Sequence, residues 1–463
     1  MESSGLSELK ERIIGNIDRS SEEFISFSKM IWEYAEIGLE EQKSSKLLSS
    51  TLEKNGFDVK TSIPNLQTAF VASWGEGSPI IGFLAEYDAL PGLSATEKGK
   101  SGHGCGHNLL GVASVASGIA LKRMMEEYKI SGTIRVYGCP SEETLYGKVI
   151  MASEKVFNDL DAALQWHPGT LTTSPYESLN ALDNKIYKFY GKSAHASTPW
   201  EGKSALDTAQ LFALGIEFAR EHMAEKDKIH YVITRGGNMP NIVPDFAEVW
   251  VFIRSSDMNR LIELSNKVDL CAVGASLSTE TSFEIERKIG CHLLLPNKKL
   301  SLTVGENLKL VGAPKLDERE KEFIDTRLSN KYEEFSDEVT PPSGWEEGGE
   351  WVGKPISTDV GDVSWIVPTN GMFNVSTAPK GVPYHNPDVT ILSNTSIGFK
   401  GMLVAAKTLA CTGIDLLTNQ EILAQAKDEF RRRKELQKWN YEPLLPAKIE
   451  YPKYGWKPTI VPK

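Results

Sequence analysis

The chain has 463 residues, a length at which a single hydrophobic core rarely suffices, so we expect two domains. Its composition, with 40 % hydrophobic and 24 % charged residues, is that of a folded globular protein and excludes a disordered one. The formal net charge of −11 disfavours nucleic acid and membrane surfaces as partners, because both carry negative charge.

The cysteines and the amino terminus indicate the cellular compartment. The five cysteines are odd in number and lie far apart, which argues against a disulfide framework and is typical of a reducing compartment. The first twenty residues are charged and amphipathic and lack the apolar core of a signal peptide. We recognise no run of about 18 apolar residues that could span a bilayer. The sequence therefore predicts a cytoplasmic enzyme.

The first part of the chain alternates between helical and extended patterns. Apolar residues at three- to four-residue intervals predict helices over 20–38 and 40–56, and Ser20 and Glu23 have the spacing of a capping box. Small residues predict a further helix over 109–127. Apolar runs predict strands within 57–63, 68–74, 79–92, 132–144 and 160–169. This alternation predicts an α/β fold with a mostly parallel sheet.

From about Ser178 the pattern changes to strand, helix, strand, strand, helix, strand, which is typical of an α+β domain of the split βαβ type. We place this inserted domain at 180–295 and assign 1–179 and 296–463 to the first domain, which ends in two helices. The tail 441–463 is rich in proline, lysine and aromatic residues, so we expect either a wrapping arm or a loosely ordered segment.

Polar side chains follow several of the predicted strands or lie in glycine- and proline-containing loops. In an α/β sheet the carboxyl ends of parallel strands meet at one edge, so these residues can lie close together. Thiolate, imidazole and carboxylate groups are ligands of first-row divalent metals, and in a Glu-Glu pair one carboxylate can bind metal while the other acts as a general base. The residues are Glu86, Asp88, Cys105, His107, Glu142, Glu143, His167 and His385.

Each residue also has a purely structural interpretation. An isolated cysteine such as Cys105 is commonly a small core residue, and Glu142–Glu143 could be the solvated start of a helix. His103 could support the site or be a turn residue. His167 and His385 could each be a hydrogen-bonded residue at the end of a strand. The spacing matches neither a zinc finger nor a His-Glu-x-x-His motif. Spacing alone leaves both interpretations open.

Seven motifs carry a resemblance to a known family. In chain order they are "AEYDALPG", "GHGCGHN", "PSEE", "WHPG", "GKSAHAS", "GGNMPNIVPD" and "PYHNP". Their order resembles that of the dimetal aminoacylase/carboxypeptidase superfamily, in the amidohydrolase branch with a cysteine ligand. Within that branch the chain is most similar to the group of B-type subunits of p-aminobenzoyl-glutamate hydrolase, partly through "STDVGDVSW". The resemblance covers roughly residues 20–435.

The resemblance implies a pair of divalent metal ions, manganese or zinc, in each chain. Cys105 would bridge them as a thiolate. His107 and His167 would complete the shell of one ion, and Glu143 and His385 that of the other.

The resemblance also implies roles around the metals. Glu142 would be the general base and then the general acid, and Asp88 would orient a ligand imidazole. The branch often has an aspartate where this chain has Asn108, which agrees with the B-type group but puts the fine tuning of the site in doubt.

Residues of the inserted domain would complete the reaction. By the same resemblance, His195 would enter the active site of a partner subunit and stabilise the developing oxyanion, while Asn241 and Arg254 would hold the substrate's carbonyl or carboxylate. Alternatively, His195 only orders a turn, and Arg254 only keeps an edge strand soluble.

The predicted function is hydrolysis of an N-acyl or N-aroyl amino acid, a small-molecule amide, with p-aminobenzoyl-glutamate as the leading candidate. A homodimer, or a pair with a related subunit, is the expected assembly. Two alternatives remain: a dipeptidase that uses the same site, and a non-catalytic partner subunit. A dinucleotide enzyme is disfavoured, because "GHGCGHNLLG" does not match the G-x-G-x-x-G pattern.

Overall fold

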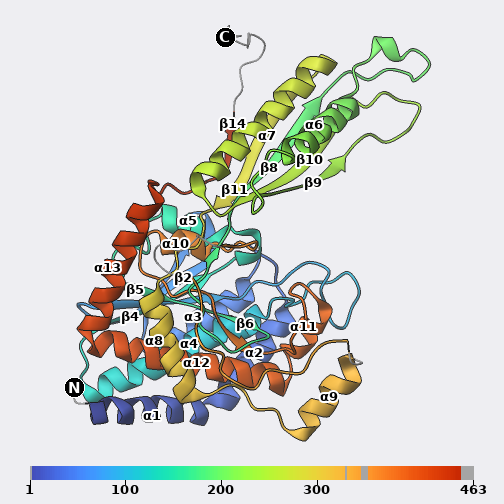
Figure 1. The fold of residues 1–463 in the computed structure, drawn as a ribbon. Helices are drawn as coiled ribbons and strands as arrows, with labels where there is room; N and C mark the ends of the chain where they lie inside the picture. Colours follow the sequence, from blue (N-terminus) through green and yellow to red (C-terminus); the bar gives the residue numbers. More distant parts are fainter. Residues whose placement is uncertain (1–2, 329–330, 346–352, 450–463) are drawn as a thin grey trace. The chain divides into compact units, whose positions relative to one another are not determined.

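The computed structural model describes residues 3–328, 331–345 and 353–449, which form two compact units (Figure 1). Among the described residues, the first unit comprises 3–178, 294–345 and 358–441. The second unit comprises 179–293, 353–357 and 442–449. Residues 450–463, most of the predicted wrapping or loosely ordered tail, lie outside the description.

The first unit is built on a five-stranded sheet of order β1-β2-β4-β3-β5. Strands β3, β4 and β5 are parallel to one another, whereas β1 and β4 run antiparallel to β2. Strands β6 and β13 form a separate parallel pair. The strands are β1 Asp58–Ile63, β2 Leu66–Glu76, β3 Ile80–Glu86, β4 Gly132–Cys139, β5 Ala162–Leu164, β6 Trp166–Gly169 and β13 Phe373–Ser376.

The α/β class is confirmed, but the sheet is mixed rather than mostly parallel, because β2 runs antiparallel to both of its neighbours. The reason is local, because only two residues separate β1 from β2, and so short a turn can join only antiparallel strands. Asn65 in this turn has φ +63°, a left-handed conformation that asparagine tolerates well. The parallel part of the sheet is the part that ends at the polar residues singled out in the sequence.

Two long helices form the centre of the first unit's core. Helix α4 (His107–Tyr128) packs against α12 (Ser396–Thr418), and α1 (Ser3–Arg19) contacts both (Figure 1). By length and composition α12 is apolar enough to cross a membrane, so the expectation that the sequence holds no such run is wrong. Of that apolar window, 78 % is buried inside the structure, so its composition reflects packing in the core.

The predicted helices near the amino terminus are present, but the predicted capping box is not. Ser20 makes no side-chain capping hydrogen bond, because α1 ends at Arg19 and Ser20 keeps a near-helical backbone between two helices. The remaining helical segments of the unit are α2 Ser21–Tyr34, α3 Gln42–Lys54, η1 Glu142–Thr144, α5 Gly147–Ser153, α8 Lys298–Val311, α9 Glu318–Leu328, α10 Val360–Ser364, α11 Pro387–Leu392 and α13 Gln420–Gln437.

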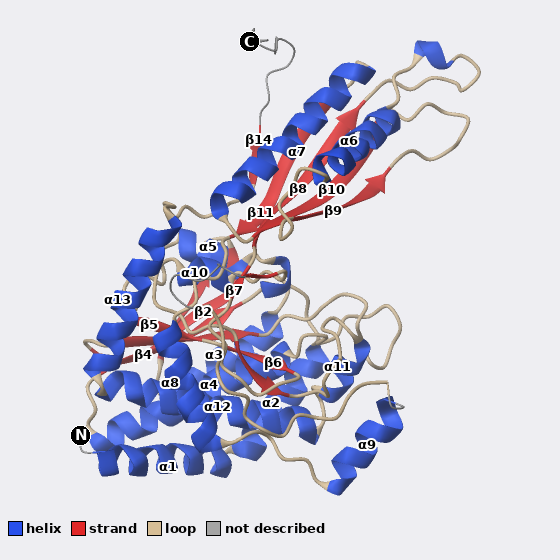
Figure 2. Ribbon diagram, in the orientation of Figure 1, coloured by secondary structure: helices blue, strands red, loops and turns tan. Residues whose placement is uncertain are grey.

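The second unit is an antiparallel sheet with two helices on one face (Figure 2). The strand order is β14-β11-β8-β10-β9, and alternate residues of β10, such as Val249 and Val251, are buried against helices α6 and α7. The predicted order of strand, helix, strand, strand, helix, strand is confirmed. The elements are β7 Ser178–Leu179, β8 Ala181–Tyr190, η2 Pro199–Glu201, α6 Ala205–Arg220, β9 Lys228–Arg235, β10 Phe246–Ser255, α7 Met258–Thr279, β11 Ser282–Cys291, β12 Gly353–Lys354 and β14 Ala447–Ile449, although Ser178 of β7 is counted with the first unit.

Candidate metal centre

The parallel strands of the first unit bring the acidic residues to one edge. Glu86 at the end of β3 pairs in register with Cys139 at the end of β4. Asp88 follows two residues after the first of these strands, and Glu142 and Glu143 follow three and four residues after the second. These carboxylates therefore lie close together although more than fifty residues separate them in the chain.

A glycine-rich loop places the thiol and the first imidazole beside these carboxylates. Gly106 has φ +75°, which only glycine adopts without strain, and a Cβ atom there would lie 3.1 Å from Pro168. The turn buries the side chain of Cys105 and starts α4 at His107. The backbone N–H of His385 donates to the Gly104 carbonyl at 3.1 Å, so a distant loop closes over the same turn.

The structure brings all five predicted metal ligands together in two groups. Cys105, His107 and His167 offer ligand atoms that all lie within 4.8 Å of one another, and so do Cys105, Glu143 and His385. The two groups share the cysteine. A thiolate with two imidazoles, beside a thiolate with an imidazole and a carboxylate, is a donor set suited to a pair of first-row divalent ions.

Asp88 connects the two groups. Its carboxylate accepts a hydrogen bond from His107 Nδ1 at 2.8 Å and another from the Glu143 backbone N–H at 2.9 Å. Because Nδ1 of His107 is the donor, its Nε2 is the nitrogen free to bind metal. The His167 Nδ1 similarly donates to the Pro168 carbonyl at 2.6 Å, which leaves Nε2 of this second imidazole as the unprotonated nitrogen.

The polar atoms of the site fit bound metal. His107 Nε2 and Glu143 Oε1 are buried and have no hydrogen-bond partner among the described residues. Such atoms are costly in a folded protein unless another group satisfies them. Burial raises the pKa of the Cys105 thiol well above its usual value, so a thiolate at this position requires a neighbouring cation. Both observations are explained by cations held between the two groups.

Glu142 lies beside the predicted ligands, outside these two groups but within 4.8 Å of ligand atoms of Glu86 and His107. Thr358 donates to its Oε1 at 2.7 Å, while its Oε2 lies 4.0 Å from His107 Nε2. Burial, followed by the negative charges of Glu86 and Asp359, raises the pKa of Glu142 well above its ordinary value. A carboxylate with high proton affinity next to metal ligands is chemically suited to take and return a proton.

Three residues next to Glu142 were not identified as site residues from the sequence. They are Thr358, Asp359 and the fully buried Lys148, whose Nζ lies 2.7 Å from Glu86 Oε1. The threonine and the aspartate belong to the "STDVGDVSW" segment, which the sequence analysis used only as a mark of resemblance. A charged residue in the apolar run "GKVIMA" was the available sign of the lysine.

His103 and Asn108 support the loop from outside the ligand groups. The Nε2 of His103 donates to the Ile31 carbonyl at 3.0 Å, and burial lowers the pKa of this imidazole to about 4, so it is neutral. The Asn108 amide donates to Ser28 Oγ and to the Ser393 carbonyl, each at 3.0 Å. The Asn108 amide therefore holds the start of α4 against neighbouring segments.

The remaining predicted residues lie in the second unit. His195 and Asn241 are neighbours, because the backbone N–H of Ala196 donates to the Asn241 carbonyl at 3.0 Å. The Ser197 backbone N–H donates to His195 Nδ1 at 3.1 Å, so the neutral imidazole carries its proton on Nε2. Both side chains are exposed.

Arg254 lies on β10, an interior strand between β8 and β9, so the interpretation as an edge-strand residue is wrong. Its guanidinium lies over the Phe252 ring at 5.3 Å, and its Nε is buried without a hydrogen-bond partner among the described residues.

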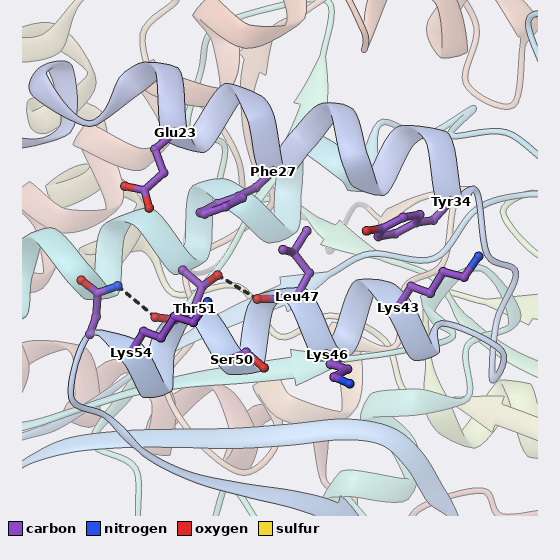
Figure 3. A pocket seen from close by; sticks show the side chains of 10 residues that line it. Glu23, Phe27, Tyr34, Lys43, Lys46, Leu47, Ser50, Thr51 and Lys54 are labelled. Carbon is purple, nitrogen blue, oxygen red and sulfur yellow. Dashed lines mark hydrogen bonds between the residues drawn. The ribbon is translucent and has the colours of Figure 1, made fainter.

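Two other features of the first unit are an exposed aromatic ring near the ligand groups and a surface groove away from them. Tyr384 is 43 % exposed, and its ring centroid lies 5.2 Å from that of His167 in an edge-on arrangement, so an aromatic surface borders the ligand groups. A groove between α2 and α3 is lined by Phe27, Tyr34 and Leu47 and by lysines (Figure 3). None of its lining residues belongs to the ligand groups, so the groove is separate from the candidate metal centre.

Comparisons with known proteins agree with this geometry. Residues 176–272 match the model of a peptidase dimerisation domain. The B-type subunit of p-aminobenzoyl-glutamate hydrolase from Escherichia coli (strain K12) is 36 % identical over 454 residues, covering 90 % of this chain and 93 % of that protein. The Xaa-Arg dipeptidase of Mus musculus is 29 % identical over 438 residues, covering 91 % of this chain and 92 % of that one.

Solved structures share the fold at low sequence identity. An aminobenzoyl-glutamate utilization protein from Klebsiella pneumoniae aligns with a TM-score of 0.59 at 16 % identity, covering 86 % of this chain and 97 % of that one. A dinuclear metal-binding peptidase of the M20 family from Bacillus subtilis aligns with a TM-score of 0.58 at 15 % identity, covering 87 % and 99 %.

Proposed function

The chain belongs to the M20 peptidase family, in the group of B-type subunits of p-aminobenzoyl-glutamate hydrolase, and on that premise we propose which amide it cleaves and how. It is a metal-dependent amidohydrolase. The proposed reaction is hydrolysis of an N-aroyl or N-acyl amino acid, with p-aminobenzoyl-glutamate as the leading candidate. The observation that carries the proposal is one cysteine shared by two ligand groups, with the Glu142 carboxylate beside these two groups.

Cys105, His107, His167, Glu143 and His385 would hold two divalent ions, zinc or manganese. Bound there, the ions would supply Lewis acidity, which makes water acidic near neutral pH and polarises an amide carbonyl. Asp88 would keep the first imidazole in the tautomer that presents Nε2.

Glu142 would carry the proton through the reaction. As a carboxylate it would take a proton from the attacking water, and as a carboxylic acid it would give that proton to the leaving amine. The raised proton affinity of this buried group supports both halves of the cycle, because the protonated form must persist until the carbon–nitrogen bond breaks.

The second unit is proposed to be a dimerisation and lid domain. Its match to a peptidase dimerisation domain indicates pairing with another chain, either a second copy or a related subunit. Leu214 and Phe218 on α6 are 50 % and 73 % exposed, and Val232 on the edge strand β9 is 52 % exposed, which supports an apolar interface.

In such a pair His195 would donate from Nε2 to the developing oxyanion in the partner's site. Asn241 and Arg254 would hold the carbonyl or carboxylate of the substrate. The orphaned Nε of Arg254 supports an anionic ligand at that side chain.

An aroyl group is favoured over a small acyl group by Tyr384. Its exposed ring next to His167 offers an aromatic surface for a substrate ring beside the ligand groups. A dipeptidase is the second candidate, supported by the similarity to Xaa-Arg dipeptidase along nearly the whole chain. The complete donor set and general base argue against a non-catalytic partner subunit. All five cysteines are free, which supports the proposed cytoplasmic location.

Glu142→Gln tests the proposal, because glutamine keeps the shape of the side chain and cannot accept the proton. Hydrolysis should collapse while two metal ions per chain remain bound, and the exposed-site control Glu126→Gln should behave as wild type. A panel of p-aminobenzoyl-glutamate, benzoyl amino acids, acetyl amino acids and dipeptides, run on stripped enzyme with zinc or manganese restored, identifies the substrate class. Full activity of Glu142→Gln would remove this residue from the mechanism, and exclusive turnover of dipeptides would favour the second candidate.

A further inference from the structure

A fully buried lysine lies next to the proposed general base. Lys148 stands in the first turn of α5, and its Nζ lies 2.7 Å from Glu86 Oε1 and 2.5 Å from Asp359 Oδ1. The backbone N–H of the same lysine donates to the other oxygen of Asp359 at 2.8 Å. All three side chains are at most 3 % exposed, so we call them the buried triad.

The buried triad fixes the start of α10. Asp359 immediately precedes this helix, and both of its oxygens are held by Lys148. Thr358 comes directly before Asp359 in the chain. It is therefore held next to α5 by the two hydrogen bonds that Asp359 accepts from Lys148. Burying three charged side chains costs free energy of solvation. Buried ionic networks of this kind can fix one particular arrangement of the segments that carry them.

Thr358 transmits this geometry to Glu142. The backbone N–H of Val360 donates to the Thr358 hydroxyl oxygen at 3.3 Å, which leaves the hydroxyl proton to be donated to Glu142 Oε1 at 2.7 Å. With that oxygen held, the second oxygen of the carboxylate is the one that faces His107 Nε2, at 4.0 Å. The hydroxyl thus selects which oxygen of the base is directed toward the metal ligands.

We propose that Thr358 is a positioning residue for the general base Glu142, and that the buried triad holds Thr358 in place. The inference rests on the proposed function, because it assigns a purpose to the orientation of Glu142. The alternative is that the threonine and the triad only stabilise the packing of α5 against α10, which lie side by side (Figure 1). The two interpretations differ in what happens when the hydroxyl alone is removed.

Thr358→Val removes the hydroxyl and keeps the shape of the side chain, while Thr358→Ser keeps the hydroxyl and loses a methyl group. If the residue positions the base, the valine variant loses about 10- to 100-fold in kcat with KM within about twofold of wild type, because a misplaced catalytic group lowers the rate of the chemical step. The serine variant should retain most of the activity. Both should bind two metal ions per chain with unchanged affinity. Equal rates for the two variants would refute the positioning role.

Crystal structures of the metal-free variants give a readout independent of activity. We expect the Glu142 carboxylate to keep its orientation in Thr358→Ser and to rotate in Thr358→Val. An unchanged carboxylate in the valine variant would contradict the inference.

A double-mutant cycle tests the link to the buried triad. Asp359→Asn leaves one amide oxygen for the two donors of Lys148, so Thr358 should shift and kcat should fall. If the triad acts through Thr358, the double variant Asp359→Asn/Thr358→Val should be no slower than Thr358→Val alone, because coupled effects are not additive. Independent, multiplying losses would refute the link. An inactive Glu142→Gln beside a fully active Thr358→Val would sink this inference and leave the proposed function intact.

Discussion

Asp88→Asn should weaken metal binding, because a single carboxylate serves both ligand groups. Its two oxygens accept from His107 Nδ1 at 2.8 Å and from the Glu143 backbone N–H at 2.9 Å, and the side chain is fully buried. Asparagine has the same shape and only one acceptor oxygen, so one of the two donors faces an amide NH₂ and loses its partner.

The size of the effect follows from that lost hydrogen bond. A buried donor without a partner costs about 1–3 kcal/mol, and each 1.4 kcal/mol corresponds to about a tenfold change in an equilibrium constant. We therefore expect metal affinity to fall about 10- to 100-fold, the range typical of partners that orient metal-binding histidines. At saturating metal most of the activity should return, because the ligands themselves are intact.

Competition with a chromophoric chelator measures the affinity for zinc and for manganese directly. A matched control is Asp183→Asn in the second unit, since both oxygens of this buried carboxylate also accept hydrogen bonds, from Arg287 and Ser265. The control should lose stability and keep its metal affinity. If Asp88→Asn binds metal as tightly as wild type, the carboxylate does not orient the ligands and the reasoning fails.

Three further predictions concern the partner's contribution, the substrate ring and pH. His195→Ala should lower kcat about 10²–10³-fold in a steady-state assay, because a donor to the oxyanion is lost, and a change in KM alone would contradict that role. Tyr384→Ala should raise KM for benzoyl amino acids about 2- to 10-fold and spare acetyl amino acids, and equal effects on both would exclude a stacking surface. Burial raises the pKa of Glu41 to about 7, so this carboxyl favours folding while protonated, and its contribution is lost as pH rises from about 4.5 through about 7. The free energy of unfolding, measured with urea on the metal-free chain, should therefore rise for Glu41→Gln relative to wild type by about 2–3 kcal/mol between pH 5 and pH 8. If the difference between variant and wild type is the same at both pH values, Glu41 is not the group that titrates.

The sequence was sufficient to predict the elements that pattern alone determines. The apolar run before Glu86 and the one before Cys139 are strands that need burial on both faces, so their parallel pairing and common edge follow from general rules. The glycines around Cys105 likewise indicate a tight turn into a helix. These features predict that Cys105, His107 and Glu143 lie at one edge, whereas the full set of five ligands was implied only by the resemblance to the family.

The features that were missed depend on contacts between distant residues. No local pattern shows that Lys148 faces Asp359, because 211 positions separate them and each has an ordinary solvent-exposed alternative. The expected capping box at Ser20 is wrong for a local reason instead, since Ser20 directly follows α1 and its backbone N–H donates to carbonyls of that helix. The apolarity of α12 indicates a core position only when its packing against α1, α4 and α8 is seen.

Anomalous X-ray diffraction from crystals grown with zinc or manganese tests the central claim most directly. The account predicts two metal peaks per chain with Cys105 Sγ between them, His107 and His167 on one, and Glu143 and His385 on the other. A single peak without a sulfur ligand, or metal bound away from these side chains, would contradict it.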